Sequence, residues 1–114
     1  MEEKFKLLTG REHNQLVDHQ GYLIHKDMKE AFISLQAKVK SELGADLQII
    51  SSFRNFERQS IIWNEKMQGK RAVLNDDGSE LNSNDFSPIE YIEKILRFSA
   101  LPGASRHHWG TDID

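Results

Sequence analysis

The last ten residues of the chain are Ser105-Arg106-His107-His108-Trp109-Gly110-Thr111-Asp112-Ile113-Asp114, and imidazoles and carboxylates are more crowded here than anywhere else in the sequence. The alternation within residues 111–114 predicts a strand with Asp112 and Asp114 on one face. Gly110 permits a turn before this strand, so the imidazole of His107 can swing over the same face. An imidazole and a carboxylate that converge in this way are typical ligands of a divalent cation, and zinc is the first candidate.

The residues alone leave two interpretations of this stretch open. His107 and one aspartate are only two ligands, whereas a catalytic zinc ion usually has three protein ligands and an open position for water. His108 or Asp112 could be the third ligand. In the alternative interpretation no metal is bound: the two histidines cap a turn, and the two aspartates are solvated strand residues.

Three amphipathic helices are predicted upstream, each from an apolar stripe of helical period and from polar residues that suit its ends. Their expected ranges are 27–43, 55–68 and 87–99. The expected caps are Asp27 and Gly44 for the first helix, Asn55 for the second, and Ser87 with Glu90 as a capping box for the third. These local signals define the helical part of the fold.

The strands are predicted from shorter patterns. Residues 46–51 are expected to form a strand, because Leu47-Gln48-Ile49-Ile50 is apolar and partly β-branched. A polar loop with Arg54 follows, which is a common position for functional side chains. Residues 21–24 are typical of a turn that leads into a short extended piece, and Asp77-Gly78 could form a small hairpin. The combination predicts an α+β fold with helices packed on a small, mainly antiparallel sheet.

Length and composition restrict the class of protein. The 114 residues are enough for one domain, 1–114, in which we interpret the polar residues 70–86 as an insertion. The net charge is −3 and no basic stripe is present, so nucleic acid is not an expected partner. The chain has no cysteine, so His, Asp or Glu must hold any metal. No apolar run is long enough to span a membrane, and no signal peptide is visible at the N-terminus.

Two motifs resemble a known family. Ser105-x-His107-x-x-Gly110-x-x-x-Asp114 resembles the Ser-x-His-x-x-Gly-x-Ala-x-Asp signature of the zinc D-alanyl-D-alanine carboxypeptidases and dipeptidases of the VanY and VanX kind. Peptidoglycan endopeptidases of the same superfamily share this signature. Upstream, residues 51–54 followed by Gln59 are similar to the family's Ser-Gly-Tyr-Arg segment and its downstream glutamine. The resemblance covers residues 28–114 and includes the order of the predicted elements.

The resemblance implies a zinc metallopeptidase that hydrolyses peptidoglycan peptides, most simply as a D-alanyl-D-alanine carboxypeptidase. It implies that His107 and Asp114 are zinc ligands. It also implies that Arg54 is a catalytic residue that holds the substrate, assisted by Gln59, with Ser105 shaping the substrate site. The implied partner is a stem peptide ending in D-alanyl-D-alanine, and the implied location is the cell envelope or periplasm.

The chain departs from the family pattern in three ways. Asp112 replaces the signature alanine, and Ser52 and Phe53 replace the glycine and tyrosine of the arginine segment. In the family, the general-base glutamate and a third ligand, a histidine, follow the aspartate that corresponds to Asp114. We therefore expect a truncated domain that lacks the C-terminal part of its sheet and is inactive or nearly so. The alternatives are a non-catalytic metal- or peptide-binding module of the same fold, and a structural domain in which the motif is coincidental.

Overall fold

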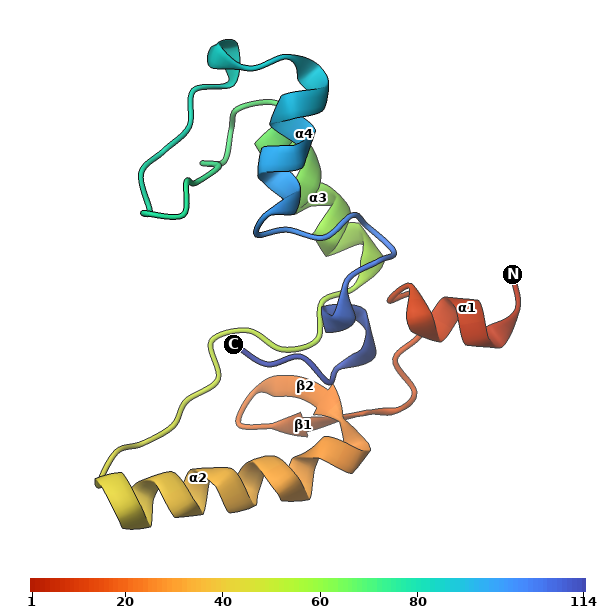
Figure 1. Cartoon of the computed structure of the whole chain (residues 1–114). Helices are drawn as coiled ribbons and strands as arrows, with labels where there is room; N and C mark the ends of the chain where they lie inside the picture. Colours follow the sequence, from red (N-terminus) through yellow and green to blue (C-terminus); the bar gives the residue numbers. More distant parts are fainter.

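A two-stranded antiparallel hairpin forms the sheet of the protein, and helices flank it in an α+β arrangement (Figure 1). The computed structural model describes all residues, 1–114. Strands β1 (Leu16–His19) and β2 (Tyr22–His25) pair with Val17 opposite Ile24. The turn between them uses positive φ at Gln20 and Gly21, which suits a tight hairpin. The predicted turn and extended piece at residues 21–24 are therefore confirmed as the second half of this hairpin.

The helices alternate with irregular segments along the rest of the chain. The α-helices are α1 (Glu3–Leu8), α2 (Lys29–Leu43), α3 (Phe56–Met67) and α4 (Pro88–Leu96). Three short 3₁₀ turns are η1 (Lys26–Met28), η2 (Ser83–Asp85) and η3 (Arg106–Trp109). No helix combines the length and the apolar character that crossing a bilayer requires.

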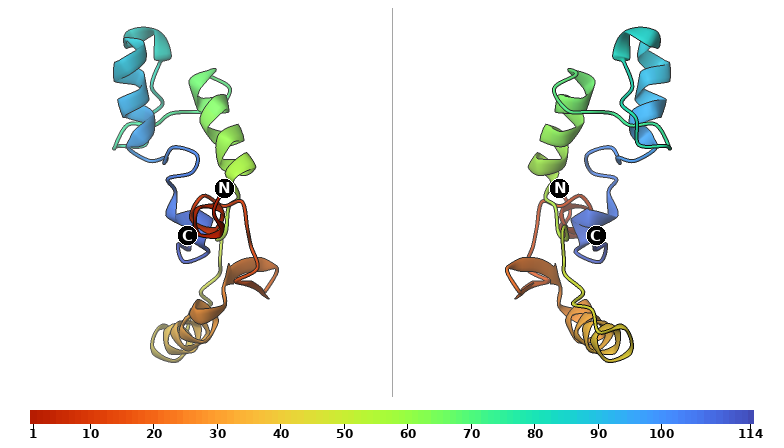
Figure 2. Two further views of the ribbon diagram at one scale, coloured as in Figure 1. Left: turned by 90° about the vertical axis from the view of Figure 1, so that its right-hand side faces the viewer. Right: turned by 90° about the vertical axis from the view of Figure 1, so that its left-hand side faces the viewer.

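The apolar core is divided into two small clusters. One joins the hairpin to α2 and contains Ile24, Phe32 and Ile49. The other lies between α3, α4 and the connection that joins them, and its buried members are Val73, Tyr91 and Ile95. Figure 2 shows these two units at opposite ends of the molecule, with α1 and η3 between them. The extents of 47 × 42 × 18 Å describe a flat, open chain, and its radius of gyration is 16.7 Å, against about 13 Å for a compact domain of this length.

The predicted helices are present, with shorter bounds at some ends. Asn55 caps α3 by accepting a hydrogen bond from the Arg58 amide, and the Ser87–Glu90 capping box begins α4. Gly44 ends α2 in the left-handed conformation. The first helix begins later than predicted, because the side chain of His25, and not of Asp27, caps the 3₁₀ turn that precedes it.

Two predicted strands are not formed. Residues 46–49 make no backbone–backbone hydrogen bond, and Leu47 O instead accepts from the side chain of Gln36. The predicted strand at 111–114 is irregular as well. The two segments meet at one point, where the amides of Ile50 and Ser51 donate to Asp114 O and the Asp114 amide donates to Ser51 O. A single meeting point does not make a ladder, so neither segment is a strand.

The polar segment 70–86 contains the small hairpin that Asp77-Gly78 allowed. Leu74 and Glu80 form an isolated antiparallel bridge around it, and Gly78 adopts a positive φ of 86°. Asp76 on this segment pairs with Arg97 beyond the end of α4. The segment is therefore tied to α4 and lies away from residues 105–114 (Figure 1).

Candidate metal and substrate site

The 3₁₀ turn η3 carries His107 and is capped at both ends. The Ser105 hydroxyl accepts a hydrogen bond from the His107 amide at 3.2 Å, which satisfies a free donor at the start of the turn. Gly110 ends the turn with a φ of 74°. A side chain at Gly110 would also meet the backbone nitrogen of His25 at 2.9 Å. The serine and the glycine of the motif thus fix where the histidine between them lies.

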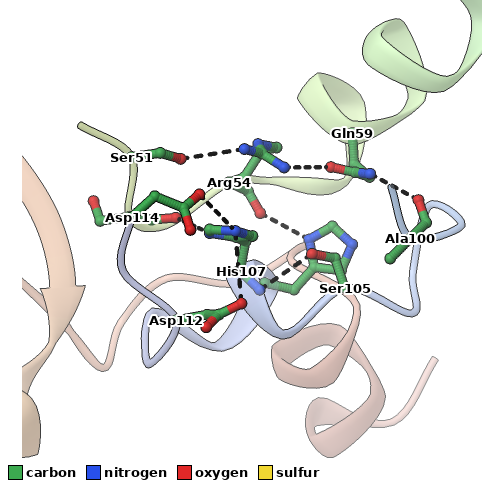
Figure 3. Close-up of polar contacts among 10 residues, drawn as sticks. Ser51, Arg54, Gln59, Ala100, Ser105, His107, Asp112 and Asp114 are labelled. Atoms are coloured by element: carbon green, nitrogen blue, oxygen red, sulfur yellow. Dashed lines mark hydrogen bonds and ion pairs between the residues drawn. The ribbon is translucent and has the colours of Figure 1, made fainter. Parts of the chain in front are cut away.

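One nitrogen of the His107 ring is committed to the backbone. Nδ1 lies 2.8 Å from the carbonyl oxygen of Ser52, so Nδ1 carries the proton and donates it. The other nitrogen, Nε2, faces two carboxylates, with Asp114 Oδ2 at 3.3 Å and Asp112 Oδ2 at 3.6 Å (Figure 3). The predicted convergence of these residues on one face is present, although no strand produces it.

This arrangement fits a bound cation. Nε2 and two carboxylates face one another here, and such a group of donors would attract a metal ion placed between them. Two ligands of a tetrahedral zinc ion lie ~3.4 Å apart, which matches the 3.3 Å between His107 Nε2 and Asp114 Oδ2. The backbone carbonyl behind Nδ1 is the partner that metal-binding histidines usually have.

Fewer than three potential metal ligands converge at this point of residues 1–114. No group of three His, Cys, Asp or Glu side chains has the spacing of a complete site. The Asp112 oxygen lies farther from His107 Nε2 than the Asp114 oxygen does, and we therefore regard His107 and Asp114 as the pair that fits. Asp112 adds a second negative charge next to them.

Arg54 faces this pair from the loop that precedes α3. Its Nη1 donates to Gln59 Oε1 at 2.9 Å and its Nη2 donates to Ser51 Oγ at 3.2 Å. No carboxylate lies within ion-pair distance of Arg54: both of its hydrogen-bond partners are uncharged oxygens, and the carboxylate of Asp114 acts on it at longer range. Burial lowers the pKa of Arg54, and the negative charge of Asp114 opposes this shift. The guanidinium stays charged at neutral pH and has donors that a substrate carboxylate or oxyanion can use.

The side chains of the other two predicted substrate-binding residues, Gln59 and Ser105, bond to neighbouring groups of the protein. Gln59 is only 1% exposed; its carbonyl holds Arg54 and its amide donates to Ala100 O at 2.7 Å. Ser105 is buried, and its hydroxyl caps η3. In this structure both residues position their neighbours, and a direct contact with substrate stays a prediction.

A cavity of about 360 Å³ lies in front of these groups. Arg54, His107, Asp112 and Asp114 all line it, together with residues 98–100 and 104–106. The two predicted zinc ligands and the predicted catalytic arginine therefore open onto one cavity, which is large enough for the end of a peptide.

His108 is not a metal ligand, so one of the two candidates for a third zinc ligand is removed. It is 1% exposed, Nδ1 lies 2.7 Å from Arg54 O, and Nε2 accepts from the Gly103 amide at 3.0 Å. Both ring nitrogens are therefore used, and burial lowers the pKa of His108 so that the ring stays neutral. Sequence reasoning also missed the part of Ser52, whose carbonyl oxygen accepts from His107 Nδ1. A backbone carbonyl is present in every residue, so the residue type carries no signal for this contact.

Comparisons with known proteins identify the relatives of the chain. A family model described as VanY, D-alanyl-D-alanine carboxypeptidase, matches residues 21–114. An uncharacterized protein of Haemophilus influenzae is 37% identical over 101 residues, which cover 84% of this chain and 68% of that protein.

A solved structure has the same fold. It is the zinc complex of a mutant of the vancomycin-resistance D,D-pentapeptidase VanY from a VanB-type resistance cassette, with a TM-score of 0.65 and 19% identity. The match covers 87% of this chain and 49% of that protein, so the chain spans about half the length of this solved relative. On the match over residues 21–114, the chain belongs to the VanY family of D-alanyl-D-alanine carboxypeptidases.

Proposed function

We propose that this chain carries zinc- and substrate-holding residues of a peptidase that acts on peptidoglycan stem peptides ending in D-alanyl-D-alanine. The observation that supports this most directly is the orientation of His107. Its Nδ1 is bound to Ser52 O, and its Nε2 faces Asp114 at the separation that a shared zinc ion requires. Such a substrate belongs to the cell wall, so we also propose a location in the cell envelope or periplasm.

The charged and polar groups at the cavity have distinct parts in the proposed reaction. His107 and Asp114 would hold the zinc ion, which when bound polarises a carbonyl group and activates water. Arg54 would bind the carboxylate of the terminal D-alanine or the oxygen of the scissile carbonyl, since its charge has no direct acidic partner in the chain. Gln59 and Ser51 hold the guanidinium in place for this contact.

The proton transfers need a further group. No glutamate lines the cavity that contains His107 and Arg54. We therefore propose that the general base and a third zinc ligand come from outside residues 1–114, and that these residues alone have little or no peptidase activity. The alternative function is a non-catalytic module that binds zinc or peptide. Such a module requires only the groups that residues 1–114 contain.

Zinc titration by calorimetry tests the metal part of the proposal. The chain should bind one zinc ion, and His107→Ala should abolish binding, whereas His13→Ala should leave it unchanged because His13 is exposed and does not line the cavity. Equal zinc affinity of the chain and of His107→Ala would contradict the proposal.

Peptide assays test the substrate part. A muramyl pentapeptide ending in D-alanyl-D-alanine should bind in the presence of zinc, and Arg54→Ala should weaken this binding more than Arg58→Ala, which alters an exposed side chain of α3. Release of D-alanine by the 114 residues should be absent or barely detectable. Rapid release would show that the base lies within the chain, and a failure to bind the peptide would refute the assignment of the substrate.

A further inference from the structure

The N-terminal segment lies directly behind η3, the metal turn that carries His107. Residues 3–11 precede the stretch that matches the family model, and α1 lies beside η3 in both the front and side views (Figures 1 and 2). This helix has six residues and buries none of them. A helix so short is not stable by itself, so its contacts with the neighbouring turn hold it in place.

Three contacts join this segment to the site. The indole Nε1 of Trp109 donates to Leu8 O at 3.0 Å. The Phe56 amide donates to Gly10 O at 3.1 Å, directly after the arginine loop. The Arg11 guanidinium lies 3.7 Å from the centre of the Phe56 ring. Residues 8–11 are thus attached both to η3 and to the start of α3.

Gly10 lies between these attachments and against the ring of His108. Its φ is +75°, and a Cβ atom there would lie 2.5 Å from His108 Nδ1 and 2.9 Å from Cγ. That same Nδ1 donates to Arg54 O, and the Arg54 amide in turn donates to His107 O. The His108 ring therefore connects the arginine loop to the metal turn, and it has room for this only because residue 10 has no side chain.

We propose that residues 3–11 are a brace that positions the site. The brace holds His108 and Trp109 from behind, and through their hydrogen bonds it sets the directions of His107 and Arg54. Gly10 is the positioning residue of the brace, and none of its members touches substrate or metal. The positioning of His107 and Arg54 by the brace does not depend on the proposed function, whereas the effect of the brace on zinc affinity rests on that function.

Gly10→Ala tests the brace, and Gly69→Ala is its matched control. Both glycines have a φ of 75°, but a Cβ at Gly69 meets no atom within 4 Å. The two substitutions therefore carry the same backbone penalty, and only the first displaces His108. Imidazole nitrogen and proton NMR signals of the ¹⁵N-labelled chain report whether His107 and His108 keep their Nδ1 protons. Calorimetry measures the zinc affinity, which depends on how the ligands are placed.

Gly10→Ala should shift the His108 and His107 imidazole signals, speed hydrogen exchange at the Arg54 amide, and weaken zinc binding about 10- to 100-fold, the usual cost of losing an outer contact of a metal ligand. Gly69→Ala should leave the imidazole signals and the zinc affinity unchanged. A folded Gly10→Ala chain with unchanged signals and unchanged zinc affinity overturns the brace.

A second variant decides the matter if Gly10→Ala does not fold. Trp109→Phe keeps the aromatic ring and removes only the donor to Leu8 O. It should free α1, seen as faster exchange of its amides, and shift the His107 imidazole signal; release of α1 without a change at His107 overturns the brace. If neither the unchanged chain nor Gly69→Ala binds zinc, the proposed function fails, and the imidazole signals and the Arg54 amide alone decide about the brace.

Discussion

Gln59 offers the sharpest single test of how the site is held. Its side chain is buried and makes two hydrogen bonds, one from Arg54 Nη1 at 2.9 Å and one to Ala100 O at 2.7 Å. Gln59→Leu keeps a side chain of similar size and removes both bonds. The guanidinium then loses one of its two partners, and the chain after α4 loses one of its attachments to α3, because the bond from Lys66 to Ser99 remains.

The expected loss of stability follows from the two bonds. A hydrogen bond to a charged group contributes about 1.5–3 kcal/mol and one between neutral groups about 0.5–1.5 kcal/mol. The two contributions together amount to about 2–4.5 kcal/mol, and because water can reach part of the Arg54 side chain we expect a total below the upper limit, about 2–4 kcal/mol. For a domain of this size, 1 kcal/mol corresponds to ~4 °C in the melting temperature, and the expected decrease is therefore ~8–16 °C.

Thermal unfolding followed by circular dichroism measures this decrease. Gln48→Leu is the control, because Gln48 is exposed and makes no side-chain hydrogen bond. Peptide binding should weaken in Gln59→Leu while zinc affinity changes little, since His107 has its own partner in Ser52 O. A melting temperature within 2 °C of the Gln48→Leu control would refute the assignment of Gln59 as the support of Arg54.

Three further changes test neighbouring features. Asp114→Ala should remove most zinc affinity in calorimetry, whereas Asp112→Ala should lower it only a few-fold, because the Asp112 oxygen lies farther from the imidazole. Asn55→Ala should cost about 1 kcal/mol in urea denaturation, as loss of an N-cap does. Arg97 holds the pKa of Asp76 below its ordinary value, so the contribution of this pair is present above the ordinary carboxyl pKa and is lost as the pH falls through the lowered one. NMR shifts of the 74–80 hairpin should report this acid transition, and Asp76→Asn should abolish it.

The parts of the fold that could be predicted from the sequence are those with local causes. The cap at Asn55 and the capping box at Ser87 depend on residues within three positions, so the sequence contains the whole interaction. The strand predicted at 46–51 depends on a partner elsewhere in the chain. Residues 46–49 have no such partner, and a β-branched apolar run does not by itself make a strand.

The hairpin shows a signal that sequence reasoning did not use. Strand β1, Leu16–His19, lacks a clear alternation, so it was not predicted. The dipeptide Gln20-Gly21 between the two strands has the form of a tight hairpin turn with glycine in second place. Attention to this dipeptide would have indicated both strands.

The two histidines differ in how far the sequence predicts their positions. The motif predicts that His107 and Asp114 lie together, and the structure brings both to one cavity with Arg54, while their role as zinc ligands stays a prediction. The role of His108 could not be predicted, because the 3₁₀ turn sends neighbouring side chains in different directions. One ring faces the carboxylates and the next is buried against Arg54 O and Gly103 N.

Hydrogen bonds between distant loops, and not apolar burial, hold this site together. The accessible surface is 7743 Å², against ~6400 Å² for a compact protein of this mass, and neither apolar cluster contains a residue of the site. The rings of His107 and His108 instead bond to backbone carbonyls 55 and 54 residues away. Each such bond contributes only about 0.5–1.5 kcal/mol, so its loss should displace a ligand while the helices remain folded. Zinc affinity should therefore respond to the loss of either of these two imidazole bonds before the melting temperature does.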